Sequence, residues 1–184
     1  EATEENPEPK TVVFHEAHLW IPIVQGCLLT SWQARLLRDC TKKERKYYNP
    51  PGSMKRFWLY NMDKALEFLD MTVTEGVTDS WAAGENSIAL FGKSCSLQQQ
   101  KLMSTLWGHG GSCVIALDED ARKDAEDLAY TLRLNKVFPR GVAVAELQGD
   151  PDGYADKNEL QDIIEQARKT CHNDVGMFDL TIDI

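Results

Sequence analysis

Two stretches, MTVTEGVTD (residues 71–79) and SCVIALDED (residues 112–120), decide the fold that this sequence predicts. Each is a short β-prone run that stops abruptly at carboxylates, at Glu75 in the first stretch and at Asp118 in the second. Carboxylates are costly to bury unless an opposite charge compensates them, and a divalent cation is the natural compensation. We therefore interpret the two stretches as strands whose acidic ends form a metal site.

Strand and helix signals alternate after Asp70, which is typical of a parallel sheet with crossover helices. Ser96 and Gln99 have the spacing of a capping box at the start of one of these helices. A further edge strand is predicted at 178–184. The main strands are predicted at 71–74, 87–91, 113–117 and 142–147, and the helices at 78–83, 97–107, 121–134 and 156–169.

The region before Asp70 predicts a small β-containing subdomain. Apolar runs at 19–24 and 27–37 flank the turn signal Gln25-Gly26, which indicates a hairpin. A polar loop follows, then the pair Pro50-Pro51, which cannot lie inside a helix. A short strand is expected at 57–60, and a helix at 62–69 with Asn61 as its cap.

The predicted fold class is therefore α/β: a Rossmann-like domain with a central parallel sheet, preceded by a small basic α+β subdomain. The expected boundaries are a flexible linker at 1–10, the subdomain at 11–70 and the parallel-sheet domain at 71–184.

Composition describes a soluble globular chain of one domain or two small ones, with 42% hydrophobic and 27% charged residues among 184. The sequence contains no run of about 18 apolar residues, so no transmembrane helix is predicted. The five cysteines are widely spaced and form no C-x-x-C pair, so neither a zinc ribbon nor a disulfide framework is indicated. A reducing, cytoplasmic setting fits.

Charge is segregated along the chain, although the net charge is -9. Residues 31–60 carry eight basic side chains against two acidic ones, whereas residues 61–184 have a net charge of -11. The sequence therefore joins a basic segment, suited to phosphates, to an acidic one.

The acidic strand ends favour a site for Mg2+ or Mn2+, since clustered carboxylates are the ligands that these hard cations prefer. Asp118 and Asp120, two residues apart, are expected on one side of their strand, near Glu75. Gly76 is expected to permit a sharp turn. The stretch GDPD (residues 149–152) follows another predicted strand and adds a third acidic end. Single acidic residues are commonly helix caps, but three such ends in one sheet are hard to explain that way.

These residues resemble the TOPRIM domain, and most closely that of DnaG-type bacterial and phage primases. The matching stretches are TEGVTD (74–79), IALFG (88–92), IALDEDA (115–121) and LQGDPD (147–152). The basic segment around Trp32, Arg35 and KYYNP (46–50) is similar to the small subdomain that precedes TOPRIM in primases. The resemblance covers about residues 19–167.

The resemblance implies synthesis of RNA primers from NTPs on single-stranded DNA, with two or more Mg2+ or Mn2+ ions, no zinc in this chain and a replicative helicase as partner. Glu75, Asp118 and Asp120 would be catalytic. The metal ligands implied are Glu75, Asp79, Asp118, Asp120, Asp150 and Asp152, and the nucleic-acid or nucleotide contacts are Arg35, Lys46, Tyr48, Lys55 and Arg56.

Two other functions remain open from the sequence. One is a TOPRIM-type metal-dependent nuclease, and the other is a non-catalytic template-binding module of a larger helicase protein. The sequence departs from the primase pattern at Ala121-Arg122-Lys123, where the family has a small Ala-Gly pair, and in the length of the loop after Asp152.

Overall fold

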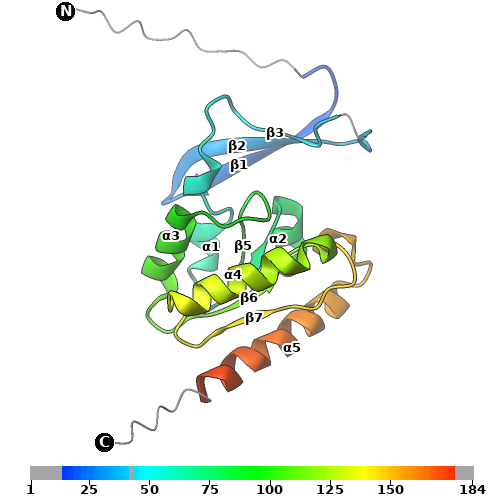
Figure 1. Cartoon of the computed structure of the whole chain (residues 1–184). Helices are drawn as coiled ribbons and strands as arrows, with labels where there is room; N and C mark the ends of the chain where they lie inside the picture. Colours follow the sequence, from blue (N-terminus) through cyan, green and yellow to red (C-terminus); the bar gives the residue numbers. More distant parts are fainter. Residues whose placement is uncertain (1–13, 42–43, 177–184) are drawn as a thin grey trace, which may run out of the picture.

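The computed structural model describes residues 14–41 and 44–176, which form two β-sheets stacked one above the other in Figure 1. The first sheet is antiparallel, with strand order β1-β2-β3. The second is parallel, with order β5-β4-β6-β7, and helices lie between its strands in the sequence. The predicted α/β class, with a small antiparallel sheet ahead of a parallel one, is confirmed.

The antiparallel sheet is built on the predicted hairpin. Strands β1 (His18–Gln25) and β2 (Leu28–Leu36) pair across a two-residue turn in which Gly26 and Cys27 both have positive φ, at 63° and 61°. This is the turn geometry that matches the twist of a hairpin. A third strand, β3 (Tyr47–Tyr48), pairs with β2 through Ala34 and Arg35. No strand was predicted for residues 47–48.

Two predictions for residues 57–69 are wrong. The segment has the 3-10 helix η1 (Lys55–Phe57) instead of a strand at 57–60, and only Tyr60 forms a bridge, to Ala89. Helix α1 (Met62–Ala65) stops after four residues. Asn61 lies at the N-cap position, but its backbone is left-handed, with φ of 58°, and its side chain makes no capping bond. Its side-chain Nδ2 instead donates to the carbonyls of Glu85 and Ser87 at 3.0 and 2.9 Å.

The parallel sheet has the four predicted strands, although two of them are shorter than expected. The chain leaves β5 before Phe91, whose φ of 64° cannot continue a strand. The predicted strand at 178–184 lies outside the described residues. The strands are β4 (Asp70–Thr74), β5 (Ser87–Ala89), β6 (Ser112–Ala116) and β7 (Val142–Val144).

Four α-helices follow the strands, close to their predicted positions. The capping box of α3 is present. The backbone amide of Gln99 donates to the Ser96 hydroxyl at 3.1 Å, and the backbone amide of Ser96 donates to the Gln99 side-chain oxygen at 2.9 Å. Two 3-10 turns, η2 (Glu119–Ala121) and η3 (Pro151–Gly153), complete the domain. The helices are α2 (Val77–Ala83), α3 (Leu97–Trp107), α4 (Arg122–Leu134) and α5 (Lys157–Gly176).

Both faces of the parallel sheet are buried, and alternate residues of β6 serve the two cores. Cys113 and Ile115 pack in a cluster with residues of α3 and α4, whereas Val114 and Ala116 pack in a second cluster with residues of α2 and α5. The carboxyl ends of the strands therefore meet at one edge, the usual ligand-binding edge of such sheets.

The two sheets are joined by polar contacts. The Asp63 carboxylate accepts from the amides of Gly26 and Cys27, both at 2.8 Å, which fixes the hairpin turn to α1. Leu59 and Met62 are buried in the core cluster of the parallel sheet. The domain boundary near residue 70 stays a prediction. Within the described ranges, no helix is both long and apolar enough to cross a membrane.

Candidate metal and nucleic-acid site

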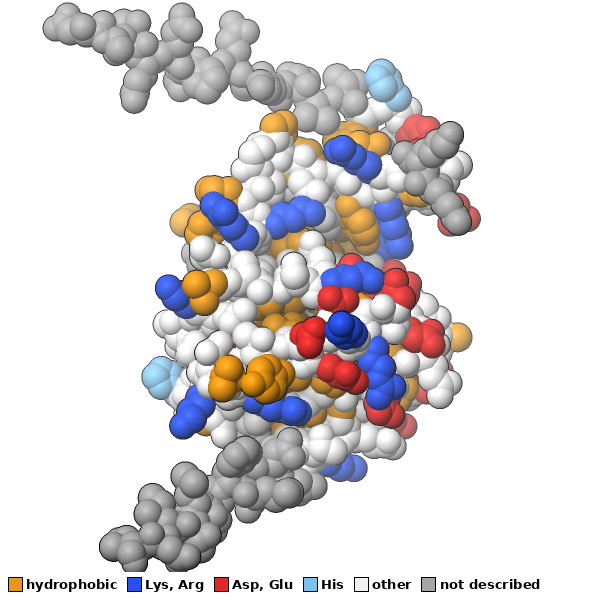
Figure 2. Space-filling model, in the orientation of Figure 1, with side chains coloured by type: hydrophobic (Ala, Val, Ile, Leu, Met, Phe, Trp, Pro, Cys, Tyr) orange, Lys and Arg blue, Asp and Glu red, His pale blue; other side chains and the backbone are white. Residues whose placement is uncertain are grey.

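Carboxylates gather where β4 and β6 end. The two strands are paired, with Thr74 opposite Ala116, and Glu75 and Asp118 follow directly or after one further residue. Figure 2 shows acidic side chains grouped with basic ones near the start of α4. We call the six predicted ligands the acidic cluster: Glu75, Asp79, Asp118, Asp120, Asp150 and Asp152.

The carboxylates of this cluster act on one another electrostatically. Burial raises the pKa of Asp118 to about 7, and the negative charges of Asp79, Asp150, Glu75 and Asp120 add to that rise. Burial also raises the pKa of Glu75, which Lys93 opposes and the neighbouring carboxylates reinforce. The cluster therefore holds more negative charge than its surroundings neutralise.

Two oxygens of the cluster are buried without a hydrogen-bond partner, Oε2 of Glu75 and Oδ1 of Asp118. A buried unpaired carboxylate oxygen is costly, so each needs a proton or a cation. Among the described residues, no three His, Cys, Asp or Glu side chains converge closely enough to form a ready ligand set. The donors nevertheless suit Mg2+, which keeps several waters and uses only one or two protein carboxylates.

Asp79 lies in the first turn of α2 and is buried, with 6% of its surface exposed. Its Oδ2 accepts from the Gly76 amide at 2.8 Å, which closes the start of the helix. A Cβ at Gly76 would lie 2.8 Å from that oxygen, whereas the Gly76 φ of -114° is open to any residue. The chain does bend at residues 75 and 76, and the Gly76 φ shows that this bend does not itself demand glycine, so the absence of a Cβ matters mainly for the close approach of Asp79.

Asp120 and Asp150 are placed differently from the sequence argument. Strand β6 stops at Ala116 and residues 119–121 form η2, so strand alternation does not extend to Asp120. β7 stops at Val144, so Asp150 lies on a loop just before η3. Asp150 still reaches the cluster, since its charge raises the pKa of Asp118.

Two cations are paired with the cluster. Nη1 of Arg35 lies 3.4 Å from Oδ2 of Asp152, and Nζ of Lys93 lies 2.7 Å from Oδ1 of Asp120. Lys93 was not among the predicted site residues. Its position two residues after the end of the predicted strand 87–91 was the available signal, because residues after parallel strands share one edge.

The predicted nucleic-acid residues lie mostly on the antiparallel sheet and η1. Arg35 and Lys46 line a pocket of about 640 Å3, which we call the basic pocket. Both also approach the Tyr47 ring, with Cζ of Arg35 at 5.6 Å and Nζ of Lys46 at 5.9 Å from its centroid. Tyr48 packs edge-on against Phe14 and is partly exposed. Lys55 and Arg56 lie on η1, where burial lowers the pKa of Lys55 and Arg56 stacks on Phe57.

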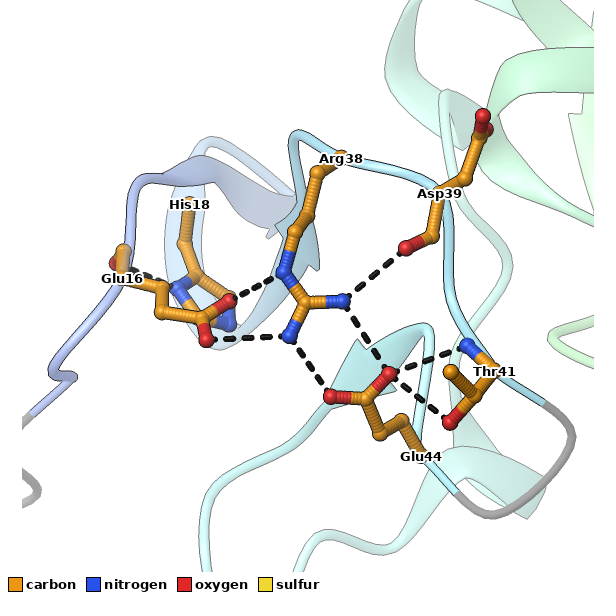
Figure 3. A network of polar contacts seen from close by, with 6 residues as sticks. All are labelled: Glu16, His18, Arg38, Asp39, Thr41 and Glu44. Carbon is orange, nitrogen blue, oxygen red and sulfur yellow. Dashed lines mark hydrogen bonds and ion pairs between the residues drawn. The ribbon is translucent and has the colours of Figure 1, made fainter.

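Arg38 belongs to the basic segment, but its guanidinium is already paired with carboxylates of the protein itself (Figure 3). It binds Glu16 through Nε and Nη2, at 2.7 and 2.9 Å, and Glu44 through Nη1 and Nη2, at 3.0 and 2.6 Å. Its guanidinium lowers the pKa of Glu16, and lowers that of Glu44 to about 2 together with bonds from Thr41. Arg38 therefore fixes the loop after β2 to the segment before β1.

No protein-family model matches the chain, and no curated protein matches it. Solved structures do match. The zinc-binding and RNA polymerase domains of Aquifex aeolicus primase superpose with a TM-score of 0.66 and 24% identity, over 82% of this chain and 40% of that one. The RNA polymerase domain of Mycobacterium tuberculosis DnaG gives 0.64 and 21%, over 89% and 60%.

The chain has the fold of a DnaG primase catalytic core. The E. coli primase catalytic core agrees, with a TM-score of 0.59 and 20% identity. The chain spans about half the length of these primase structures, 40% to 60% of each. A related DnaG catalytic domain was solved bound to single-stranded DNA, and the mycobacterial domain in complex with double-stranded DNA.

Proposed function

We propose that this chain is the catalytic core of a DNA primase, which makes short RNA primers from NTPs on single-stranded DNA by metal-dependent nucleotidyl transfer. One observation carries the proposal. Glu75 and Asp118 bury unpaired carboxylate oxygens at the ligand-binding edge of a primase-like parallel sheet. Helix capping does not account for Asp118, because it precedes η2 without a side-chain capping bond.

The acidic cluster would hold Mg2+ or Mn2+ through Glu75 and Asp118, with Asp120, Asp150 and Asp152 as further ligands. When bound, such ions would stabilise the charge of the phosphoryl transition state and acidify the attacking 3′-hydroxyl. Asp79, whose Oδ2 is taken by the Gly76 amide, would contribute mainly by ordering the turn that carries Glu75.

Glu75 is the candidate proton acceptor. Burial raises the pKa of Glu75 above the ordinary value of a glutamate, which makes its carboxylate a stronger base. The Glu75 carboxylate has two oxygens, so one could face a cation while the other would take the proton of the primer 3′-hydroxyl.

The basic side chains would hold the template and the triphosphate. Arg35 is suited to bridging the two sheets, because it lines the basic pocket and also contacts Asp152. Lys46 lies near the same Tyr47 ring, which offers an aromatic surface on which a base could stack. Tyr48, Lys55 and Arg56 would extend this surface, and a replicative helicase would be the partner of the whole protein.

The test is template-dependent synthesis of labelled oligoribonucleotides by the chain, with Mg2+ or Mn2+, on a panel of single-stranded templates. Products that require template, NTPs and metal together support the proposal. Absence of products on every template, from protein with an intact fold by circular dichroism, would contradict it. Metal-dependent cleavage of the template without NTPs would indicate a nuclease instead.

A second candidate is a non-catalytic template-binding module. The observation in its favour is that Asp120 and Asp152 are already paired with Lys93 and Arg35. Titration with Mn2+ separates the two functions, because an active site must bind the ion through Glu75 and Asp118, whereas a degenerate site has no need to.

A further inference from the structure

Lys93 lies on a turn that is attached to the metal-binding edge. The chain leaves β5 through Phe91 and Gly92, both at positive φ, and the Gly92 amide donates to the Glu75 carbonyl at 3.1 Å. This backbone bond fixes the segment next to Glu75. The backbone of Lys93 is therefore held next to Glu75, the candidate catalytic carboxylate at the end of β4.

The contact between Lys93 and Asp120 is close but solvent-exposed. Nζ lies 2.7 Å from Oδ1, with 39% of the Lys93 side chain and 78% of the Asp120 side chain exposed. Ion pairs with this exposure contribute little to folding stability. A lysine ammonium also sits on a flexible four-carbon stem, so it can leave without disturbing the backbone.

The charges around Lys93 indicate that its contact with Asp120 compensates negative charge in the acidic cluster. The acidic cluster has six carboxylates, and Arg35 and Lys93 are the cations that the described structure pairs with them. The cluster therefore has more carboxylates than cations paired with them. Lys93 also acts on Glu75, where it is the positive charge that opposes the rise in the pKa.

We propose that Lys93 is a resident counter-ion that competes with divalent cations for Asp120. A first cation binds at Glu75 and Asp118, whose buried oxygens have no partner. A second cation binds at Asp120 more weakly, because the Lys93 ammonium must first move away from that carboxylate. The inference rests on the proposed metal-dependent function and adds an order of loading to it.

The experiment is a titration of the full chain with Mn2+, without nucleotide or DNA, in which free Mn2+ is read from its electron paramagnetic resonance signal. The variants are Lys93→Met, which keeps the length and removes the charge, and Lys93→Arg, which keeps the charge. Lys101→Met is the matched control for net charge, since Lys101 is exposed on α3, away from the cluster.

We expect Lys93→Met to tighten the weaker Mn2+ site about fivefold, as expected for removal of one positive charge next to a divalent ion at the solvent boundary. Lys93→Arg and Lys101→Met should stay within about twofold of wild type. In an Asp120→Asn background the effect of Lys93→Met should disappear, since the carboxylate for which they compete is gone.

Unchanged Mn2+ binding in Lys93→Met would overturn this inference and leave the proposed function standing. The same is true if the tightening persists in the Asp120→Asn background, because Lys93 would then act elsewhere. Failure of the wild-type chain to bind Mn2+ would overturn both the inference and the metal-dependent function.

Discussion

Arg35 on the antiparallel sheet and Asp152 on η3 lie 3.4 Å apart, Nη1 to Oδ2, although 117 residues separate them in the sequence. This ion pair brings the basic pocket and the acidic cluster together at one place. A nucleotide that carries phosphates and bound cations would meet both kinds of charge there, which is the arrangement that phosphoryl transfer requires.

Arg35→Ala is expected to weaken binding of single-stranded DNA about three- to tenfold and to lower the salt dependence of binding by about one phosphate contact. The physical reason is the loss of one guanidinium from the basic pocket. Fluorescence anisotropy with a labelled oligonucleotide, at several salt concentrations, measures both effects. Lys169→Ala, on the exposed surface of α5, is the control and should leave the slope unaltered.

Glu75→Gln is expected to lower primer synthesis by at least about 100-fold, because the amide can neither accept the proton nor hold a cation strongly. DNA binding should be nearly unchanged. The assay is single-turnover extension with radiolabelled NTPs, with Glu159→Gln on α5 as the control for loss of an exposed carboxylate. Synthesis at the wild-type rate would remove Glu75 from the mechanism.

The stability of the metal-free protein should fall as pH rises from about 4 to 7. The pKa of Asp118 is about 7 in the folded chain and has its ordinary value of 3.8 when unfolded, so the folded state binds more protons in that window. Asp118→Asn removes this dependence and should raise the melting temperature at pH 7.5 by about 2–4 °C. That corresponds to about 1 kcal/mol, after discounting for partial solvent exposure.

Differential scanning calorimetry in EDTA, at pH 5 and pH 7.5, measures this effect. Asp162→Asn, an exposed position on α5, is the control and should change the two melting temperatures equally. A pH profile of Asp118→Asn that parallels the wild type would show that the Asp118 proton does not govern stability.

Gly76→Ala should destabilise the fold by about 1–3 kcal/mol, the usual cost of forcing a methyl group into a filled space. The new Cβ would lie 2.8 Å from Oδ2 of Asp79, while the backbone there allows alanine. Denaturant unfolding measures the loss. The same substitution in an Asp79→Ala background should cost less than half as much, since the clashing oxygen is gone, and equal costs would point to another cause.

The positions of strands and helices were predictable from the sequence where the local pattern and the tertiary packing favour the same structure. β6 is buried on both faces, α3 has a strong capping box, and both ended where the pattern placed them within one residue. Glu75 and Asp118 followed from the same logic, because the ends of parallel strands converge.

The failures occurred where tertiary contacts override local preference. Asn61 is of a residue type that commonly caps helices, but its side-chain amide donates to the carbonyls of Glu85 and Ser87, which belong to a distant segment. Tyr47 and Tyr48 form a strand because β2 offers an edge, which no local pattern reveals. The pairing of Lys93 with Asp120 depends on a turn at Phe91 that a strand prediction extends through.

Gln99 joins parts of the molecule that the sequence keeps apart. Beyond closing the capping box, its side-chain amide donates to the carbonyls of Trp58 and Leu90 at 2.9 and 3.1 Å, and Ser96 donates to the carbonyl of Arg56 at 2.6 Å. One buried amide thus ties the segment that carries Lys55 and Arg56 to the end of β5. Amide hydrogen exchange at residues 56–60 and 97–100 should accordingly report a single opening event, in which Lys55 and Arg56 move together with the edge of the sheet.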